Sequence, residues 1–112
     1  MNVKKEVELS TVSKGLYRVV SRENEMATIV LADESHPVFK AHFEGNPILP
    51  GFLHIDITAQ VFEVDITSIK SAKYFEIVRP SEQITIRLVK ENVYELSRDG
   101  VLLSKLEIKS GL

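Results

Sequence analysis

The sequence predicts an α+β fold in which one helix and six short strands share a single core. Runs rich in β-branched residues recur on both sides of the chain's middle, and turn residues separate them. One uninterrupted stretch of 15 residues is long enough for a helix. With 112 residues and no visible repeat or linker, the chain is expected to form one domain over residues 1–112.

The expected strands lie before and after the helix. Residues 16–20 and 26–31 form two strands around a turn at residues 21–24. Four more strands are predicted at residues 69–77, 84–90, 93–97 and 101–108. Asp99-Gly100 marks a hairpin turn between the last two, and Glu91-Asn92 indicates a turn before them. Residues 32–50 contain three of the four prolines and are expected to form an irregular loop.

Residues 52–66 fit the sequence pattern of a strand and also that of a helix. Leu53, Ile55 and Ile57 alternate with polar residues, as in a half-buried strand. The length of the stretch, and Pro50-Gly51 before it, favour a helix instead. Wound as a helix, the stretch has two polar stripes with apolar faces between them, so we expect it to be largely buried. The stripes are Asp56, Gln60 and Glu63, and His54, Thr58 and Asp65.

Composition excludes several functions. The chain has 14 basic and 16 acidic residues, a formal net charge of −2, which argues against a general nucleic-acid binder. It has no cysteine, so disulfides, thiolate nucleophiles and cysteine-ligated metals are excluded. The charged start and the lack of a long apolar run predict no signal peptide and no membrane span, and therefore a cytoplasmic location.

A dense motif occupies residues 42–60. Its order, His-Phe-x-Gly-x-Pro-x-x-Pro-Gly followed by an acid and a glutamine, resembles the signature of the hotdog-fold 3-hydroxyacyl-(acyl carrier protein) dehydratases (FabA/FabZ-like). Residues 78–83 resemble the Pro-Gly-Asp-Gln corner of that family, with Ser81 and Glu82 substituted. The fixed positions are His42, Phe43, Gly45, Pro47, Pro50, Gly51, Asp56 and Gln60.

Three motif residues suit the removal of water from a 3-hydroxyacyl thioester. His42 can act as a base in its neutral form, and the backbone N–H of Gly51 at a helix start can bind the thioester carbonyl. Asp56, on an otherwise apolar helix, can hold a proton for the departing hydroxyl. The resemblance implies the same roles, with Gln60, Phe43 and Pro50 in support.

Other interpretations remain open. His42 can be a packed loop residue, and Asp56 can simply bond Gln60 one turn on. The histidine spacings do not suit a metal site, so no metal or other cofactor is expected, and His36 and His54 are expected to be structural or surface residues. A hotdog acyl thioesterase and a non-catalytic acyl-binding protein are the alternative functions.

The resemblance also implies a sheet wrapped around one central helix, and a homodimer, or a multiple of one, in which His42 of one subunit faces Asp56 of the other. Its substrate would be an acyl thioester, carried on acyl carrier protein, in fatty-acid or related acyl-chain biosynthesis. Glu44, Ala41 and Glu76 depart from the family pattern, and Glu76 is acidic in a region where relatives that bind carrier protein tend to be basic. No nucleic-acid or membrane partner is expected.

Overall fold

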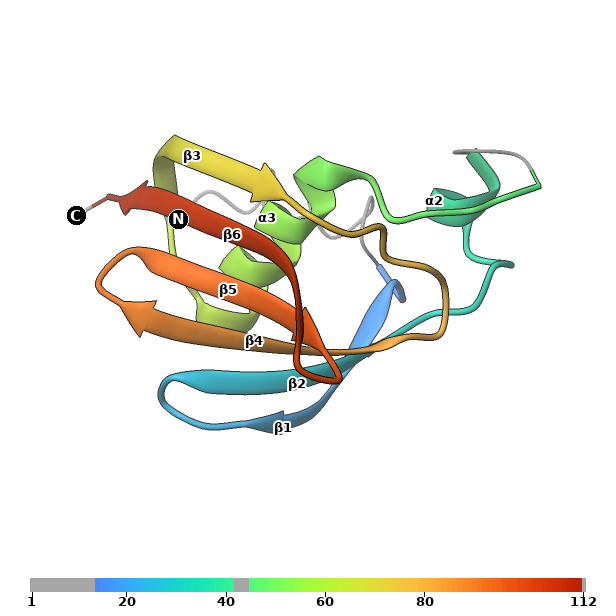
Figure 1. Ribbon diagram of the computed structural model, residues 1–112, viewed down its shortest axis with the longest axis horizontal. Coiled ribbons are helices and arrows are strands. Elements are labelled where there is room, and N and C mark those ends of the chain that lie inside the picture. Colours follow the sequence, from blue (N-terminus) through green and yellow to red (C-terminus); the bar gives the residue numbers. More distant parts are fainter. Residues whose placement is uncertain (1–13, 42–44, 112) are drawn as a thin grey trace.

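The computed structural model describes residues 14–41 and 45–111. Six strands form one antiparallel sheet in the order β1-β2-β4-β5-β6-β3, and the main helix, α3, lies against one face of it (Figure 1). The α+β class is therefore confirmed. The elements are β1 (Tyr17–Arg22), β2 (Met26–Leu31), α2 (Pro37–Ala41), α3 (Gly51–Phe62), β3 (Ile66–Tyr74), β4 (Gln83–Lys90), β5 (Val93–Arg98) and β6 (Val101–Ser110).

The sheet is built from hairpins and two long connections. β1 and β2, β4 and β5, and β5 and β6 are neighbours in both sequence and space. Asp99 and Gly100, with φ of 50° and 79°, form the predicted Asp-Gly turn between β5 and β6, and Asn92 at φ 65° lies in the turn before β5. Among the strands of residues 14–41 and 45–111, β1 and β3 are the two edges of the sheet. Because α3 directly precedes β3, the helix and this edge strand are close in sequence.

The core lies between α3 and the sheet. Alternate residues of β2 and β4 are buried, so one face of these strands is covered. The helix contributes Leu53, Ile57, Val61 and Phe62 to the same buried cluster. The main cluster members from the sheet are Ala27, Ile29, Leu31, Ile84, Ile86, Tyr94, Leu96, Leu103, Leu106 and Ile108.

The predicted helix was right in type and wrong at its end. It begins at Gly51 and stops at Phe62, because Glu63 adopts a left-handed conformation (φ 55°, ψ 47°). The N–H of Val64 then bonds the carbonyl of Ala59, which closes the last turn. Asp65 therefore does not continue a helical stripe. The other residues of this stripe, His54 and Thr58, are buried, in agreement with a largely buried helix.

Several strand boundaries differ from the sequence prediction by one or two residues, and two differences are larger. The strand expected at residues 69–77 is β3 at 66–74, shifted because it pairs with β6 from Ile66 onward. The loop expected at residues 32–50 contains the short helix α2, whose first turn is capped by His36 through its Nδ1, which accepts from the N–H of Val38 at 3.0 Å. Side-chain caps of this kind satisfy helix N–H groups that have no intrahelical acceptor.

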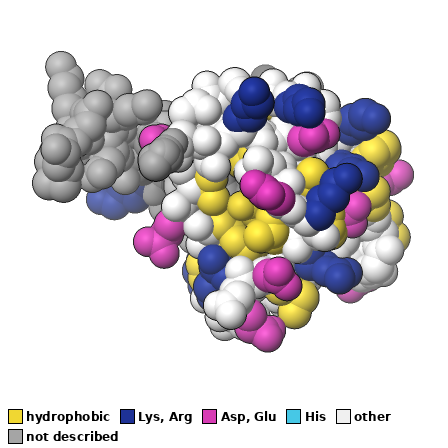
Figure 2. Space-filling model, turned by 90° about the vertical axis from the view of Figure 1, so that its left-hand side faces the viewer, with side chains coloured by type: hydrophobic (Ala, Val, Ile, Leu, Met, Phe, Trp, Pro, Cys, Tyr) yellow, Lys and Arg dark blue, Asp and Glu magenta, His cyan; other side chains and the backbone are white. Residues whose placement is uncertain are grey.

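The surface carries both signs of charge. Figure 2 shows Lys and Arg side chains interspersed with Asp and Glu around a group of hydrophobic side chains on the side that it displays. Over residues 14–41 and 45–111, no helix is long and apolar enough to cross a membrane.

Candidate active site

Of the described motif residues, Gly45 and Pro47 precede α3, and the others lie at its N-cap or along the helix. Gly51 is the first helical residue, Asp56 and Gln60 follow on the same helix, and Pro50 is the N-cap. His42 and Phe43 lie outside the described residues. The structure therefore gives the positions of the expected oxyanion donor, acid and supporting amide, while the roles of all these residues remain predictions.

The start of α3 leaves backbone donors available. Pro50 has φ −59° and ψ 145°, and no described side chain caps the helix there. The N–H of Leu49 bonds the carbonyl of Val78 at 2.7 Å, which ties the chain entering the helix to the segment before β4. The N–H of Leu53 bonds the carbonyl of Pro50 at 3.0 Å, whereas the N–H groups of Gly51 and Phe52 precede the first intrahelical acceptor and lie at the positive end of the helix dipole. An oxygen carrying partial negative charge would be stabilised there.

Asp56 lies about one and a half turns along α3. Its side chain is half-buried, and burial raises the pKa of this carboxyl above its usual value. The raised pKa means that Asp56 keeps a proton to higher pH than an exposed aspartate does. A carboxyl group that holds its proton can donate it to a leaving hydroxyl.

Tyr17 supports this part of the helix and was missed by the sequence analysis. Its hydroxyl, on β1, donates to Oε1 of Gln60 at 2.8 Å. Burial raises the pKa of Tyr17, so the phenol remains a donor. The bond joins residues 43 positions apart. No local spacing in the sequence signals it.

Tyr74 is the second residue that the sequence analysis missed. It ends β3, and its hydroxyl donates to the carbonyl oxygen of Gly51 at 2.9 Å. Its ring contacts the ring of His54 edge-on, with centroids 5.0 Å apart and an interplanar angle of 84°. The first turn of α3 is thus in contact with the edge strand of the sheet.

His54 is structural rather than a surface residue. It is 2% exposed, and its Nδ1 lies 2.9 Å from Oγ of Ser104 on β6. Burial lowers the pKa of His54 to about 4, so the imidazole is neutral near neutral pH. Its backbone carbonyl accepts from the hydroxyl of Thr58 at 2.8 Å. Among the described residues, no fully buried side-chain nitrogen or oxygen lacks a hydrogen-bond partner.

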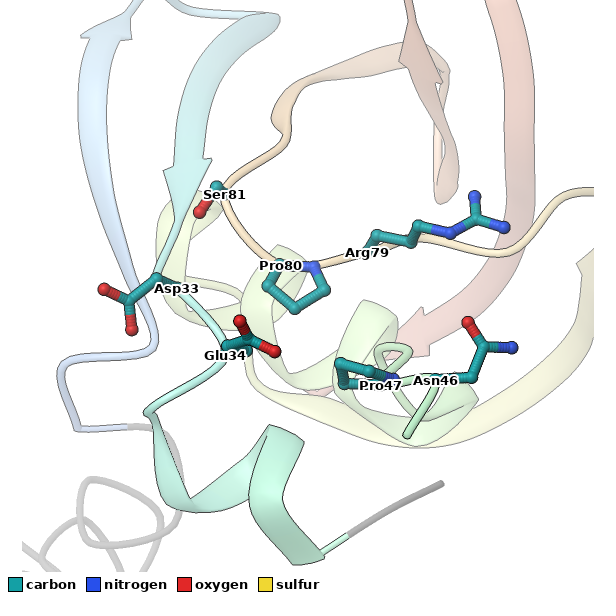
Figure 3. Close-up of a pocket in the computed structure, with 7 residues that line it drawn as sticks. All are labelled: Asp33, Glu34, Asn46, Pro47, Arg79, Pro80 and Ser81. Atoms are coloured by element: carbon teal, nitrogen blue, oxygen red, sulfur yellow. The ribbon is translucent and has the colours of Figure 1, made fainter. Parts of the chain in front are cut away.

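A cavity of about 300 Å³ opens where three loop segments meet (Figure 3). Asp33 and Glu34 line one side, and Arg79 extends away from them on the other. Glu82 holds the corner in place, because its Oε1 accepts from both the backbone N–H of Arg79 and the Arg98 side chain at 2.8 Å. The remaining lining residues are Asn46, Pro47, Pro80 and Ser81. Neither Gly51 nor Asp56 is among them.

Within the described ranges, no group of three or more His, Asp or Glu side chains is arranged to hold a metal ion. The described part of the candidate site contains the backbone N–H groups at the start of α3, the Asp56 carboxyl with its raised pKa and the hydrogen-bonded Gln60 amide.

An antiparallel sheet with one main helix is the hotdog fold that the motif predicted, and solved structures share it. The ApeI:P dehydratase heterocomplex from Xenorhabdus doucetiae matches with a TM-score of 0.65 and 24% identity over 86% of this chain and 98% of that one. Thioesterase superfamily member 2 from Mus musculus matches with a TM-score of 0.59 and 15% identity, over 97% and 90% of the two chains. At these identities, the likeness establishes the fold and leaves open which chemistry the site performs.

Sequence comparison identifies the family. Residues 18–104 match the ApeI-like family, described as ApeI dehydratase, and the chain belongs to it. The 3-hydroxyacyl-(acyl-carrier-protein) dehydratase FabZ of Ligilactobacillus salivarius is 32% identical in an alignment of 81 positions that covers 61% of this chain and 55% of that protein. The chain thus spans about half the length of the curated relatives it matches. The expected resemblance to hotdog-fold dehydratases is confirmed.

Proposed function

We propose that this protein removes water from a 3-hydroxyacyl thioester to give the trans-2-enoyl thioester. The observation that carries the proposal is the position of Asp56, a carboxyl with a raised pKa on the helix that starts at Gly51 without a side-chain cap. Membership of a dehydratase family and the FabZ relatives support the same reaction. Acyl carrier protein is the proposed carrier, and acyl-chain biosynthesis is the proposed pathway.

In the proposed mechanism, neutral His42 takes the proton from the carbon next to the thioester carbonyl. The negative charge that develops on the carbonyl oxygen is stabilised by the N–H of Gly51 and the dipole of α3. Asp56 gives its proton to the hydroxyl on the next carbon, which leaves as water. The carbon–carbon double bond forms as the bond between that carbon and the hydroxyl oxygen breaks. The same residues catalyse hydration in the reverse direction.

The role of Asp56 depends on the pKa of its carboxyl. An aspartate with an ordinary pKa would be almost fully ionised near neutral pH and could not donate. Burial opposes ionisation, so the protonated form is more populated than in an exposed aspartate. Gln60, held by Tyr17, lies one turn further along the helix and is proposed to fix the orientation of the carboxyl.

We also propose a homodimer, or a multiple of one, with sites shared between subunits. β3 is an edge strand, and an unpaired edge can pair with a second copy of itself. Large apolar side chains are exposed in the single chain on this strand and just after it, as is typical of a surface that a second subunit covers. They are Ile69, Tyr74, Phe75 and Ile77. The related structure from Xenorhabdus is a heterocomplex, so a subunit of a different protein is the second candidate for this edge.

A hotdog acyl thioesterase is the second candidate function. It would use Asp56 to direct water at the thioester carbonyl. Thioesterase superfamily member 2 from Mus musculus, which has the same fold, is the reason for testing this reaction. The test is incubation with a panel of 3-hydroxyacyl thioesters of varied chain length, on acyl carrier protein and on coenzyme A, followed by mass spectrometry. Loss of one water with the thioester intact is expected. Release of free thiol as the only product would establish the thioesterase, and no turnover on any carrier would favour a non-catalytic acyl-binding protein.

A further inference from the structure

The ring of Tyr74 fills the space beside Gly51. A Cβ atom added to Gly51 would lie 2.9 Å from Cζ of Tyr74, 3.1 Å from Cε2 and 3.3 Å from Cε1. Real Cβ atoms essentially never approach another heavy atom as closely as 2.9 Å. The hydroxyl of the same ring donates to the carbonyl oxygen of Gly51 at 2.9 Å. Tyr74 therefore contacts Gly51 through both its ring and its hydroxyl.

The backbone of Gly51 does not itself require glycine. The glycines with positive φ among the described residues are Gly15, Gly45 and Gly100, and Gly51 is not one of them. It lies in a regular α-helix, where glycine is disfavoured relative to alanine. A conformation that any residue adopts, combined with a Cβ position occupied by the Tyr74 ring, indicates that a side chain here would require that ring to move.

We propose that Tyr74 is a positioning residue for the proposed dehydration, one that holds the first turn of α3 so that the Gly51 N–H faces the thioester oxygen. This inference rests on the proposed function. Tyr74 is 45% exposed in the single chain, so the core of that chain alone does not fix its ring. Two contacts hold it, the hydrogen bond to Gly51 and the edge-on contact with the ring of His54.

The second contact links Tyr74 to the interior of the sheet. His54 is buried and its Nδ1 lies 2.9 Å from Oγ of Ser104 on β6. A connected series of contacts thus runs from β6 through His54 and Tyr74 to Gly51. The series joins the helix start to two neighbouring strands, β6 and β3, at the edge of the sheet.

This arrangement bears on catalysis because oxyanion stabilisation depends on donor geometry. A donor must lie where the charge develops, and small displacements of such groups reduce rates strongly. The donor acts mainly on the enolate-like state, since the ground-state carbonyl carries less charge. Loss of the Tyr74 hydroxyl should therefore lower kcat and leave KM nearly unchanged.

The first test is Tyr74→Phe, assayed by hydration of a 2-enoyl thioester. We expect kcat to fall roughly threefold to tenfold, as for loss of one positioning hydrogen bond, with KM within twofold. Tyr94→Phe is the matched control, because Tyr94 lies on β5 and contacts Phe62 at the far end of α3. It should retain the parent kcat. A Tyr74→Phe variant with the parent kcat would overturn the proposal.

The second test is a double-mutant cycle with Gly51→Ala, measured as thermal stability and as kcat. In the parent, the new methyl group must displace the Tyr74 ring, so we expect a clear loss of both. In a Tyr74→Ala background, the same substitution should cost much less, because the space is empty. Equal effects of Gly51→Ala in both backgrounds would show that Tyr74 is not the constraint. If Tyr74→Ala does not fold, the result for Tyr74→Phe decides.

The two proposals fail in different ways. A parent protein that turns over no thioester would remove the proposed function, while the stability cycle would still report whether Tyr74 packs on Gly51. An active parent that is insensitive to Tyr74→Phe would remove the positioning role and leave dehydration in place. Light scattering on each variant separates a change in kcat from a change in assembly.

Discussion

The Tyr17 hydroxyl lies 2.8 Å from Oε1 of Gln60, so an edge strand of the sheet holds an amide one turn beyond Asp56. With its oxygen accepting from Tyr17, the Gln60 amide has a fixed orientation. A fixed amide can orient a neighbouring carboxyl, whereas a rotating one cannot. β1 thereby contributes to the candidate site, although it lies far from the motif in sequence.

Tyr17→Phe should test this support. Removing the hydroxyl leaves the half-buried Gln60 oxygen without that donor, at a cost of about 1 kcal/mol in the free energy of unfolding. We also expect kcat to fall several-fold and its pH profile to shift, because the environment of Asp56 changes. Urea unfolding and a pH series of kcat measure the two effects. An unchanged pH profile of kcat would show that Tyr17 does not influence the ionisation of Asp56.

Ser81→Gly should stabilise the protein. Ser81 stands where the similar family has glycine, and its φ is 67°, in the left-handed region. That conformation costs a non-glycine residue about 1–2 kcal/mol, which the greater freedom of unfolded glycine partly offsets. A net gain of about 0.5–1 kcal/mol should raise the melting temperature by roughly 3 to 6 °C. Ser81→Ala, which keeps the strain, should show no such rise, and equal melting temperatures for both would refute the explanation.

Stability should depend on pH through His54. Its pKa in the folded state is about 4, below the usual value of 6.5, so the unfolded chain binds more protons between these values. Stability should therefore fall as pH decreases from about 6.5 to about 4, by up to about 1.4 kcal/mol per pH unit. His54→Gln removes the titrating group, and urea unfolding across this range should show a shallower slope. Identical slopes would mean that His54 does not carry the dependence.

Shared sites predict complementation between inactive variants. His42→Ala and Asp56→Asn proteins, refolded together, should form mixed dimers with one intact site and one site lacking both residues. About half the dimers would be mixed, so activity should return to roughly a quarter of the parent value. Each variant alone should stay inactive. No recovery despite verified subunit exchange would place both residues within one chain's site.

Much of the fold could be predicted because its signals are local. Asp99-Gly100 forms the expected hairpin, and Pro50-Gly51 correctly favoured a helix over the alternating pattern that follows it. The end of that helix could not be predicted, since Glu63 adopts a left-handed conformation that glycine or asparagine normally signals. The start of β3 was misplaced because pairing with β6, rather than composition, sets it.

The candidate site also has a part that could be predicted from local sequence and a part that could not. Gly51, Asp56 and Gln60 follow from a motif with fixed spacing on one helix. Tyr17 and Tyr74 reach the helix from edge strands, 43 and 23 positions away from their partners, and their sequence neighbourhoods resemble those of any strand. Contacts of this kind depend on sheet order, which the sequence did not provide.

The central claim is that Asp56 supplies the proton that departs with the hydroxyl. The most direct measurement compares kcat for hydration of a 2-enoyl thioester by the parent, by Asp56→Asn and by Asp65→Asn, an exposed aspartate just beyond the helix. Asp56→Asn should lower kcat about a hundredfold or more while the protein stays folded, and Asp65→Asn should match the parent. An Asp56→Asn protein within a few-fold of the parent would contradict the claim.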